Sequence, residues 1–130
     1  MKVGIVIQAR TGSTRLPGKV TMPFFENQSI LEIIIRRILK YNNPENIVLA
    51  TTVNSEDNEV VQIGEKLGVH VYKGSEDNVL SRFTEVVTKY AFDGVIRVCA
   101  DNPFLDVESF KELIDLNFSS KADYTAFCTN

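Results

Sequence analysis

Apolar residues along the chain follow two spacings: short β-branched runs and longer stretches with helical periodicity. The runs predict buried strands, and the periodic stretches predict helices. The predicted strands are Lys2–Ile7, Ile47–Thr51, Val69–Tyr72, Val95–Cys99 and, at the edge of the sheet, Asp123–Phe127. The predicted helices are Ser29–Tyr41, Glu56–Leu67, Asn78–Ala91 and Val107–Phe118.

Local signals mark several helix ends. Ser29 followed by Glu32 forms a capping box, and Gly68 suits the left-handed position after a helix. Asp77 and Asp106 are the expected N-caps of the last two helices. Because strands alternate with helices of ten or more residues, we expect βαβ units, right-handed crossovers and a mainly parallel sheet. The predicted fold is α/β, one three-layer sandwich over residues 1–130.

Composition is that of a globular protein and excludes several other classes. Of the 130 residues, 44% are apolar and 24% are charged, close to the globular average. The apolar runs are far shorter than the roughly 20 residues of a membrane span, and the stretch after Lys2 ends too early for a secretory signal. Two cysteines and one histidine, His70, argue against a disulfide framework and a structural zinc site. We expect a soluble, cytoplasmic protein with no membrane partner, and His70 pointing away from the apolar face of its strand.

Charge is unevenly distributed along the chain. Residues 1–40 hold seven basic and two acidic side chains, and the rest hold seven basic and fifteen acidic ones. A net charge of −3 is a poor fit to a nucleic-acid binder, but the basic first part suits a small polyanion. Arg36, Arg37 and Lys40 are assigned to the solvated face of their helix.

The residues after the first predicted strand carry the strongest chemical signal. In such sheets ligands bind outside the carboxyl ends of the strands, where the strand order reverses. The sequence there is Gln8-Ala9-Arg10-Thr11-Gly12-Ser13-Thr14-Arg15-Leu16-Pro17-Gly18-Lys19. Glycines let backbone amides form an anion nest, and arginine and lysine contact phosphate oxygens. The segment predicts a di- or triphosphate site, although its glycine spacing fits neither a Walker loop nor a dinucleotide fingerprint. A solvated loop with incidental charges is the alternative.

Asp101 is the candidate metal ligand. It follows the fourth predicted strand, where a carboxylate is costly to desolvate unless it is paired or metal-bound. Magnesium takes one or two carboxylates and completes its shell with water and phosphate oxygens. A salt bridge from Asp101 to Arg10 or Lys19 is a compatible alternative.

The ends of the second and third predicted strands give weaker signals. Residues there have the groups to hydrogen-bond a base or sugar, or to line a nucleoside pocket. They are Thr51, Thr52, Asn54, Gly74, Ser75 and Asp77, the last of which is also the expected N-cap of the next helix. Asn54 is equally suited to cap the helix that follows. Arg82, on the next predicted helix, either returns to the site or faces solvent.

The first segment resembles the signature of the bacterial cytidylyltransferase family, which includes spore coat polysaccharide biosynthesis proteins and the CMP-octulosonate and CMP-sialic acid synthetases. Three later blocks are similar to later blocks of that family, in the same order: Ala50-Thr51-Thr52, Gly74-Ser75-Glu76-Asp77-Asn78-Val79-Leu80-Ser81-Arg82, and Ala100-Asp101-Asn102-Pro103-Phe104-Leu105-Asp106. The resemblance implies a Rossmann-like nucleotidyltransferase. Such an enzyme uses CTP and Mg²⁺ to transfer CMP to a sugar or sugar acid with release of pyrophosphate, in surface or spore coat polysaccharide biosynthesis.

The resemblance also implies roles for individual residues. The triphosphate would be surrounded by Ala9, Arg10, Gly12, Ser13, Arg15 and Lys19. Of these, Arg10 and Lys19 would be catalytic, through charge stabilisation. Thr52, Gly74, Ser75 and Arg82 would lie on the nucleoside side, and Asp101 would bind magnesium.

Family members run about twice this length, so the chain corresponds to their N-terminal, nucleotide-binding half, as a fragment or as a natural half-domain. An open sheet edge favours self-association, so a homodimer is one expected state. Two alternative functions stay open. One is a sugar nucleotidyltransferase that uses another nucleoside triphosphate, and the other is a non-catalytic nucleotide-binding or interaction module.

Overall fold

The computed structural model describes residues 2–9, 23–74, 79–99 and 110–120. The strands within them are β1 (Val3–Gln8), β2 (Pro23–Phe25), β3 (Gln28–Ser29), β4 (Ile47–Thr52), β5 (His70–Gly74) and β6 (Gly94–Cys99). The α-helices are α1 (Ile30–Leu39), α2 (Asn58–Leu67), α3 (Val79–Tyr90) and α4 (Phe110–Ser120). Short 3-10 helices lie at Pro44–Asn46 and Ser55–Asp57.

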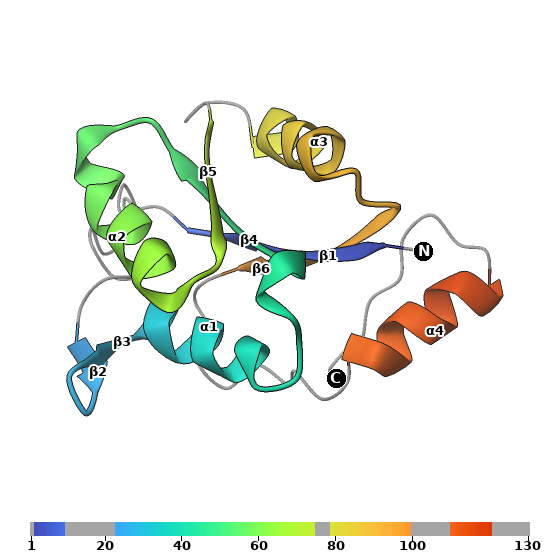
Figure 1. Cartoon of the computed structure of the whole chain (residues 1–130), viewed down its shortest axis with the longest axis horizontal. Coiled ribbons are helices and arrows are strands. Elements are labelled where there is room, and N and C mark those ends of the chain that lie inside the picture. Colours follow the sequence, from blue (N-terminus) through green and yellow to red (C-terminus); the bar gives the residue numbers. More distant parts are fainter. Residues whose placement is uncertain (1, 10–22, 75–78, 100–109, 121–130) are drawn as a thin grey trace, which may run out of the picture.

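The main sheet is parallel and has the strand order β5-β4-β1-β6 (Figure 1). β1 is central and pairs with β4 on one side and β6 on the other. Helices α1, α2 and α4 cover one face of the sheet, and α3 covers the other (Figure 1). The predicted three-layer α/β sandwich with a parallel sheet is confirmed.

Two apolar clusters hold these layers together. Ile7 and Leu49 belong to the larger cluster, with α1, α2 and α4, whereas Val6 and Val48 belong to the smaller one, under α3. Successive residues of a strand point to opposite faces, so a strand covered on both sides is apolar at every position. This explains why β1 and β4 appear in the sequence as continuous runs rather than alternating ones.

The predicted helix ends are confirmed at two positions. The Oγ of Ser29 accepts a hydrogen bond from the backbone amide of Glu32 at 3.1 Å, which caps α1. Gly68 follows α2 with a φ of 78°, the left-handed conformation that glycine adopts without strain. The helix predicted from Glu56 begins at Asn58, because the chain first forms the 3-10 turn at Ser55–Asp57.

The boundaries of β5 differ from the prediction. The strand begins one residue later than expected and extends two residues further, to Gly74. As an edge strand it tolerates exposed polar residues such as Lys73, which hid its true length in the sequence. The prediction that His70 points away from the apolar face is wrong, because His70 is opposite Val48 and so lies on the same face as the smaller apolar cluster, although it is exposed. Its ring is exposed and lies 4.8 Å from that of Tyr90.

The antiparallel hairpin of β2 and β3 was not predicted from the sequence. Its two-residue turn, Glu26-Asn27, has φ angles of 50° and 63°, the geometry of the turns that best match strand twist. Asn27 is a usual residue there, whereas Glu26 is not, so the signal was weak. The strand predicted at Asp123–Phe127 and the caps Asp77 and Asp106 lie outside the described residues.

Two glycines allow close packing against the sheet. A Cβ at Gly4 of β1 would overlap the ring of Phe92. A Cβ at Gly64 of α2 would lie 2.5 Å from Cγ2 of Val71 and 2.9 Å from Cδ2 of Leu49. Both positions need the absence of a side chain, and α2 approaches the sheet through Gly64.

Gly4→Ala should lower the free energy of unfolding by about 1–3 kcal/mol, because the added methyl overpacks the site beneath Phe92. Gly94→Ala is the matched control, since a Cβ at this other strand glycine meets nothing within 4 Å. The control should change stability by less than about 0.5 kcal/mol. Urea denaturation measures both values, and equal losses would contradict the packing argument.

Candidate functional site

The carboxyl ends of β1 and β6 lie side by side. Gln8 is opposite Cys99 in the parallel pair, so the two strands end at the same level. The chain runs from β1 to β4 and β5 on one side and then returns to β6 on the other. The strand order therefore reverses between β1 and β6, where open α/β sheets bind ligands. The Arg10–Lys19 segment and Asp101 closely follow these two strands in sequence, and they lie outside the described residues.

Ala9 extends the pairing of β1 by one residue. Its backbone amide donates to the carbonyl of Ala50 at 3.1 Å. Its methyl group is 3% exposed and belongs to the larger apolar cluster. Ala9 can therefore offer a ligand backbone groups only, and it fixes where the Arg10–Lys19 segment leaves the sheet.

The ends of β4 and β5 form a second pair at the same edge of the sheet. Thr52 is opposite Gly74, and the amide of Val53 donates to the carbonyl of Gly74 at 3.2 Å. Since neighbouring strands are about 4.8 Å apart, the end of β5 lies on the order of 10 Å from the end of β1. A nucleotide that reached from the β1–β6 junction to the end of β5 would have to span this distance.

Arg82 of α3 turns inward, which resolves the two orientations left open by the sequence. The residue is 1% exposed. Its Cγ would lie 2.7 Å from a Cβ placed on Gly74, so the arginine stem occupies the space that glycine leaves. A buried guanidinium is stable only beside groups that compensate its charge. Arg82 thus brings a fixed positive charge to the end of β5.

Thr52 is tied to a carboxylate that the sequence analysis did not nominate. Its hydroxyl donates to Oδ2 of Asp57, and both residues are 1% exposed. The same hydroxyl oxygen accepts the amide of Asn54 at 3.2 Å. Asp57 was missed because it falls among polar residues assigned to the start of the next helix. The only sign of this contact in the sequence is that Asp57 follows Thr52 by five residues.

Thr51 and Thr52 point to opposite faces of the sheet, because successive strand residues alternate. Thr52 lies on the α3 face, as Gly74 does, whereas Thr51 lies on the face that Leu49 shares with α2. The Thr51 hydroxyl is fully buried and has no hydrogen-bond partner among the described residues. The two threonines therefore cannot contact one ligand from the same side.

Asn54 makes no side-chain capping bond to the 3-10 turn that it precedes.

Four of the predicted nucleotide-binding residues lie in the described part of the chain. Thr52, Gly74 and Arg82 are brought together on the α3 side of the sheet, and Ala9 lies across β4 from them. The roles of all four stay predictions. The other predicted site residues lie outside the described ranges and are Arg10, Gly12, Ser13, Arg15, Lys19, Ser75 and Asp101.

No ready-made metal centre exists within residues 2–9, 23–74, 79–99 and 110–120. No three or more His, Cys, Asp or Glu side chains gather there in a way that could hold an ion. The predicted ligand, Asp101, is not among these residues. No helix in the described segments is long and apolar enough to cross a membrane.

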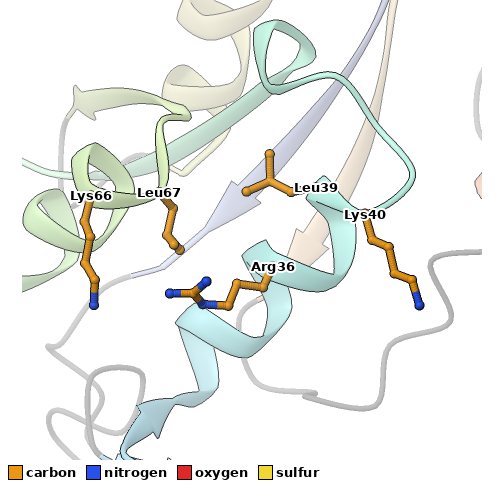
Figure 2. Close-up of a pocket in the computed structure, with 5 residues that line it drawn as sticks. All are labelled: Arg36, Leu39, Lys40, Lys66 and Leu67. Carbon is orange, nitrogen blue, oxygen red and sulfur yellow. The ribbon is translucent and has the colours of Figure 1, made fainter.

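An open cavity of about 490 Å³ lies between α1 and the end of α2 (Figure 2). Its lining residues are Arg36, Leu39, Lys40, Lys66 and Leu67. Arg36 and Lys40 are exposed, as predicted for a solvated face, whereas Arg37 is half-buried. Because α2 ends just before β5 begins, this cavity lies toward the amino end of that strand, away from the candidate site.

The fold and the predicted segments agree with a family model described as cytidylyltransferase, which matches residues 4–130. The chain belongs to the cytidylyltransferase family. The resemblance noted in the sequence is confirmed.

Individual relatives support this assignment. The chain is 38% identical over 124 residues to the spore coat polysaccharide biosynthesis protein SpsF of Bacillus subtilis, covering 92% of this chain and 51% of that protein. It is 28% identical over 121 residues to a 3-deoxy-manno-octulosonate cytidylyltransferase of Francisella philomiragia, covering 89% and 46%. A solved cytidylyltransferase from Leptospira borgpetersenii is 37% identical with a TM-score of 0.86, covering 93% of this chain and 50% of that one. The nucleotidyltransferase fold is thus shown, and the chain spans about half the length of these relatives.

Next to Arg82, a hydrogen bond from the Tyr72 hydroxyl to Glu85 joins β5 to α3. This bond, then burial and the charge of Glu85, raise the pKa of Tyr72 above 10.0. Glu85→Gln should lower the pKa of Tyr72 toward that ordinary value. An ultraviolet difference titration measures the change, with Tyr72→Phe identifying the signal.

The same bond makes stability depend on pH. Because the pKa of Tyr72 is higher in the folded state than its ordinary value of 10.0, the stabilisation is fully present below that pH. It is lost as the pH rises through the folded-state pKa. An unchanged tyrosine titration in Glu85→Gln would contradict this assignment.

Proposed function

We propose that the chain is the nucleotide-binding part of a magnesium-dependent cytidylyltransferase that transfers CMP from CTP to a sugar or sugar acid and releases pyrophosphate. The observation that carries the proposal is the pairing of the ends of β1 and β6, which the cationic segment and Asp101 closely follow in the sequence. The names of the Bacillus and Francisella relatives support a sugar or sugar-acid acceptor. They also support a role in polysaccharide biosynthesis.

Each part of the nucleotide has a proposed set of contacts. Arg10, Arg15 and Lys19 would bind the triphosphate, together with backbone amides near Gly12 and Ser13. The nucleoside would lie toward Gly74, Ser75 and Arg82, over the ends of β4 and β5. The order of contacts follows the order of strands, with phosphates at the centre of the sheet and the nucleoside toward its β5 edge.

Magnesium would be held by Asp101. A carboxylate beside triphosphate oxygens provides the hard oxygen ligands that this ion prefers, so the donor set fits the metal. When bound, the ion neutralises phosphate charge.

The proposed reaction is a substitution at the α-phosphorus. An acceptor hydroxyl oxygen forms a bond to this phosphorus, the bond to the bridging oxygen of pyrophosphate breaks, and the hydroxyl proton passes to water. The contribution of Arg10 and Lys19 is to orient the triphosphate and stabilise negative charge on the equatorial and leaving oxygens. A cytoplasmic location and a homodimer remain predictions from the sequence.

Nucleotide binding tests the base preference. Calorimetric titration with CTP, UTP, GTP and ATP in the presence of Mg²⁺ should give the lowest Kd for CTP. A lower Kd for another nucleotide would favour a different sugar nucleotidyltransferase. Binding of CTP without pyrophosphate release, with any candidate sugar acid, would favour a non-catalytic nucleotide-binding module.

Lys19→Ala should lower kcat for pyrophosphate release by about a hundredfold, because it removes one charge contact in the transition state. Lys40→Ala is the matched control, as Lys40 is exposed and lines the cavity remote from the site. The control should leave kcat unchanged. Unchanged turnover of Lys19→Ala at saturating nucleotide would remove Lys19 from the catalytic role.

A further inference from the structure

The turn after β4 contains a buried carboxylate in an unusual position. Asp57 lies at the N-cap position of α2, where an aspartate side chain commonly accepts an amide hydrogen bond from the helix. Its side chain makes no such capping bond. Oδ2 instead accepts the hydroxyl of Thr52. Asp57 is only 1% exposed, and a buried carboxylate is costly. Its hydrogen bond to Thr52, rather than helix capping, therefore explains its position.

Hydrogen bonds connect the residues of this turn to one another and to β5. The Asp57 amide donates to the Asn54 carbonyl at 3.0 Å, and the Asn54 amide donates to the Thr52 Oγ1 at 3.2 Å. The Val53 amide donates to the Gly74 carbonyl at 3.2 Å. The Thr52 hydroxyl is thus fixed as a donor and as an acceptor, and the turn is attached to the last residue of β5.

Asp57 therefore acts on the place where the nucleoside is proposed to bind. Thr52 is paired with Gly74, and the Arg82 stem lies directly over Gly74. Loss of the bond between Thr52 and Asp57 would loosen the turn, and with it the end of β5 that the Arg82 stem covers. The β1–β6 junction, where the phosphates are proposed to bind, does not include this turn.

We propose that Asp57 is a positioning residue for the nucleoside part of the nucleotide. It acts through Thr52, by holding the turn at residues 52–57 against the end of β5. The inference rests on the proposed function, since it concerns the same site. It goes beyond that proposal, because it assigns to Asp57 an effect on the affinity for the nucleoside and none on the affinity for the phosphates.

Asp57→Asn tests the inference with two probes, CTP and inorganic tripolyphosphate, each titrated calorimetrically with Mg²⁺. The substitution should raise the Kd for CTP about tenfold, as expected for weakening one hydrogen bond to a charged group. It should leave the Kd for tripolyphosphate unchanged. A purely structural role would change both values or neither.

Variants of Thr52 keep the test valid if Asp57→Asn folds poorly. Thr52→Val removes the hydroxyl and should raise the Kd for CTP as much as Asp57→Asn does. Thr52→Ser keeps the hydroxyl and should have the same Kd for CTP as the wild-type chain. The double variant Asp57→Asn/Thr52→Val should raise the Kd for CTP no further than either single variant, because both substitutions break the same hydrogen bond. Asp93→Asn is the matched control. Its carboxylate accepts the Lys2 amide at 2.7 Å near the opposite end of the sheet, and this variant should bind both probes normally.

The outcomes separate this inference from the proposed function. If the wild-type chain binds CTP and the Asp57 and Thr52 variants bind it equally well, the inference is wrong and the function stands. If tripolyphosphate affinity falls together with CTP affinity, Asp57 is not specific to the nucleoside and the inference is also wrong. If the wild-type chain binds no nucleotide, both proposals fail.

Discussion

The parallel pairing of β1 with a neighbour on each side is the constraint on which the rest of the structure depends. β1 is buried and central, and β4 and β6 run beside it in the same direction. Each connection then has to cross a face of the sheet, which places helices on both sides. The carboxyl ends of all four parallel strands therefore lie at one end of the sheet. The chemistry of this protein can therefore be concentrated there, although it comes from segments far apart in the sequence.

Much of the fold could be predicted from local patterns. Apolar runs located β1, β4 and β6, and the signals at Ser29 and Gly68 placed helix ends correctly because capping depends on only a few neighbouring residues. The hairpin of β2 and β3 was missed because Glu26 gives no sign of its positive φ. The true length of β5 was hidden because an edge strand obeys weaker rules of polarity.

The candidate site was predictable in outline but not in detail. Sequence order placed polar residues at strand ends, and the strand order then showed which ends are neighbours. The predicted strand ended at Thr51, so the alternation of faces was not applied to Thr52, which the structure includes in β4. The contact between Thr52 and Asp57 depends on a turn geometry that no local pattern specifies. Long-range packing likewise decided that Arg82 points inward.

The close approach of α2 to the sheet through Gly64 has a consequence for how the protein tolerates change. Even one methyl group at this position would meet Val71 and Leu49 and force the helix outward. Because α2 follows directly after the turn that holds Thr52, such a displacement would reach the strand ends without altering any residue there. Substitutions at this buried glycine would thus be limited by the geometry of strand ends that it does not itself contact.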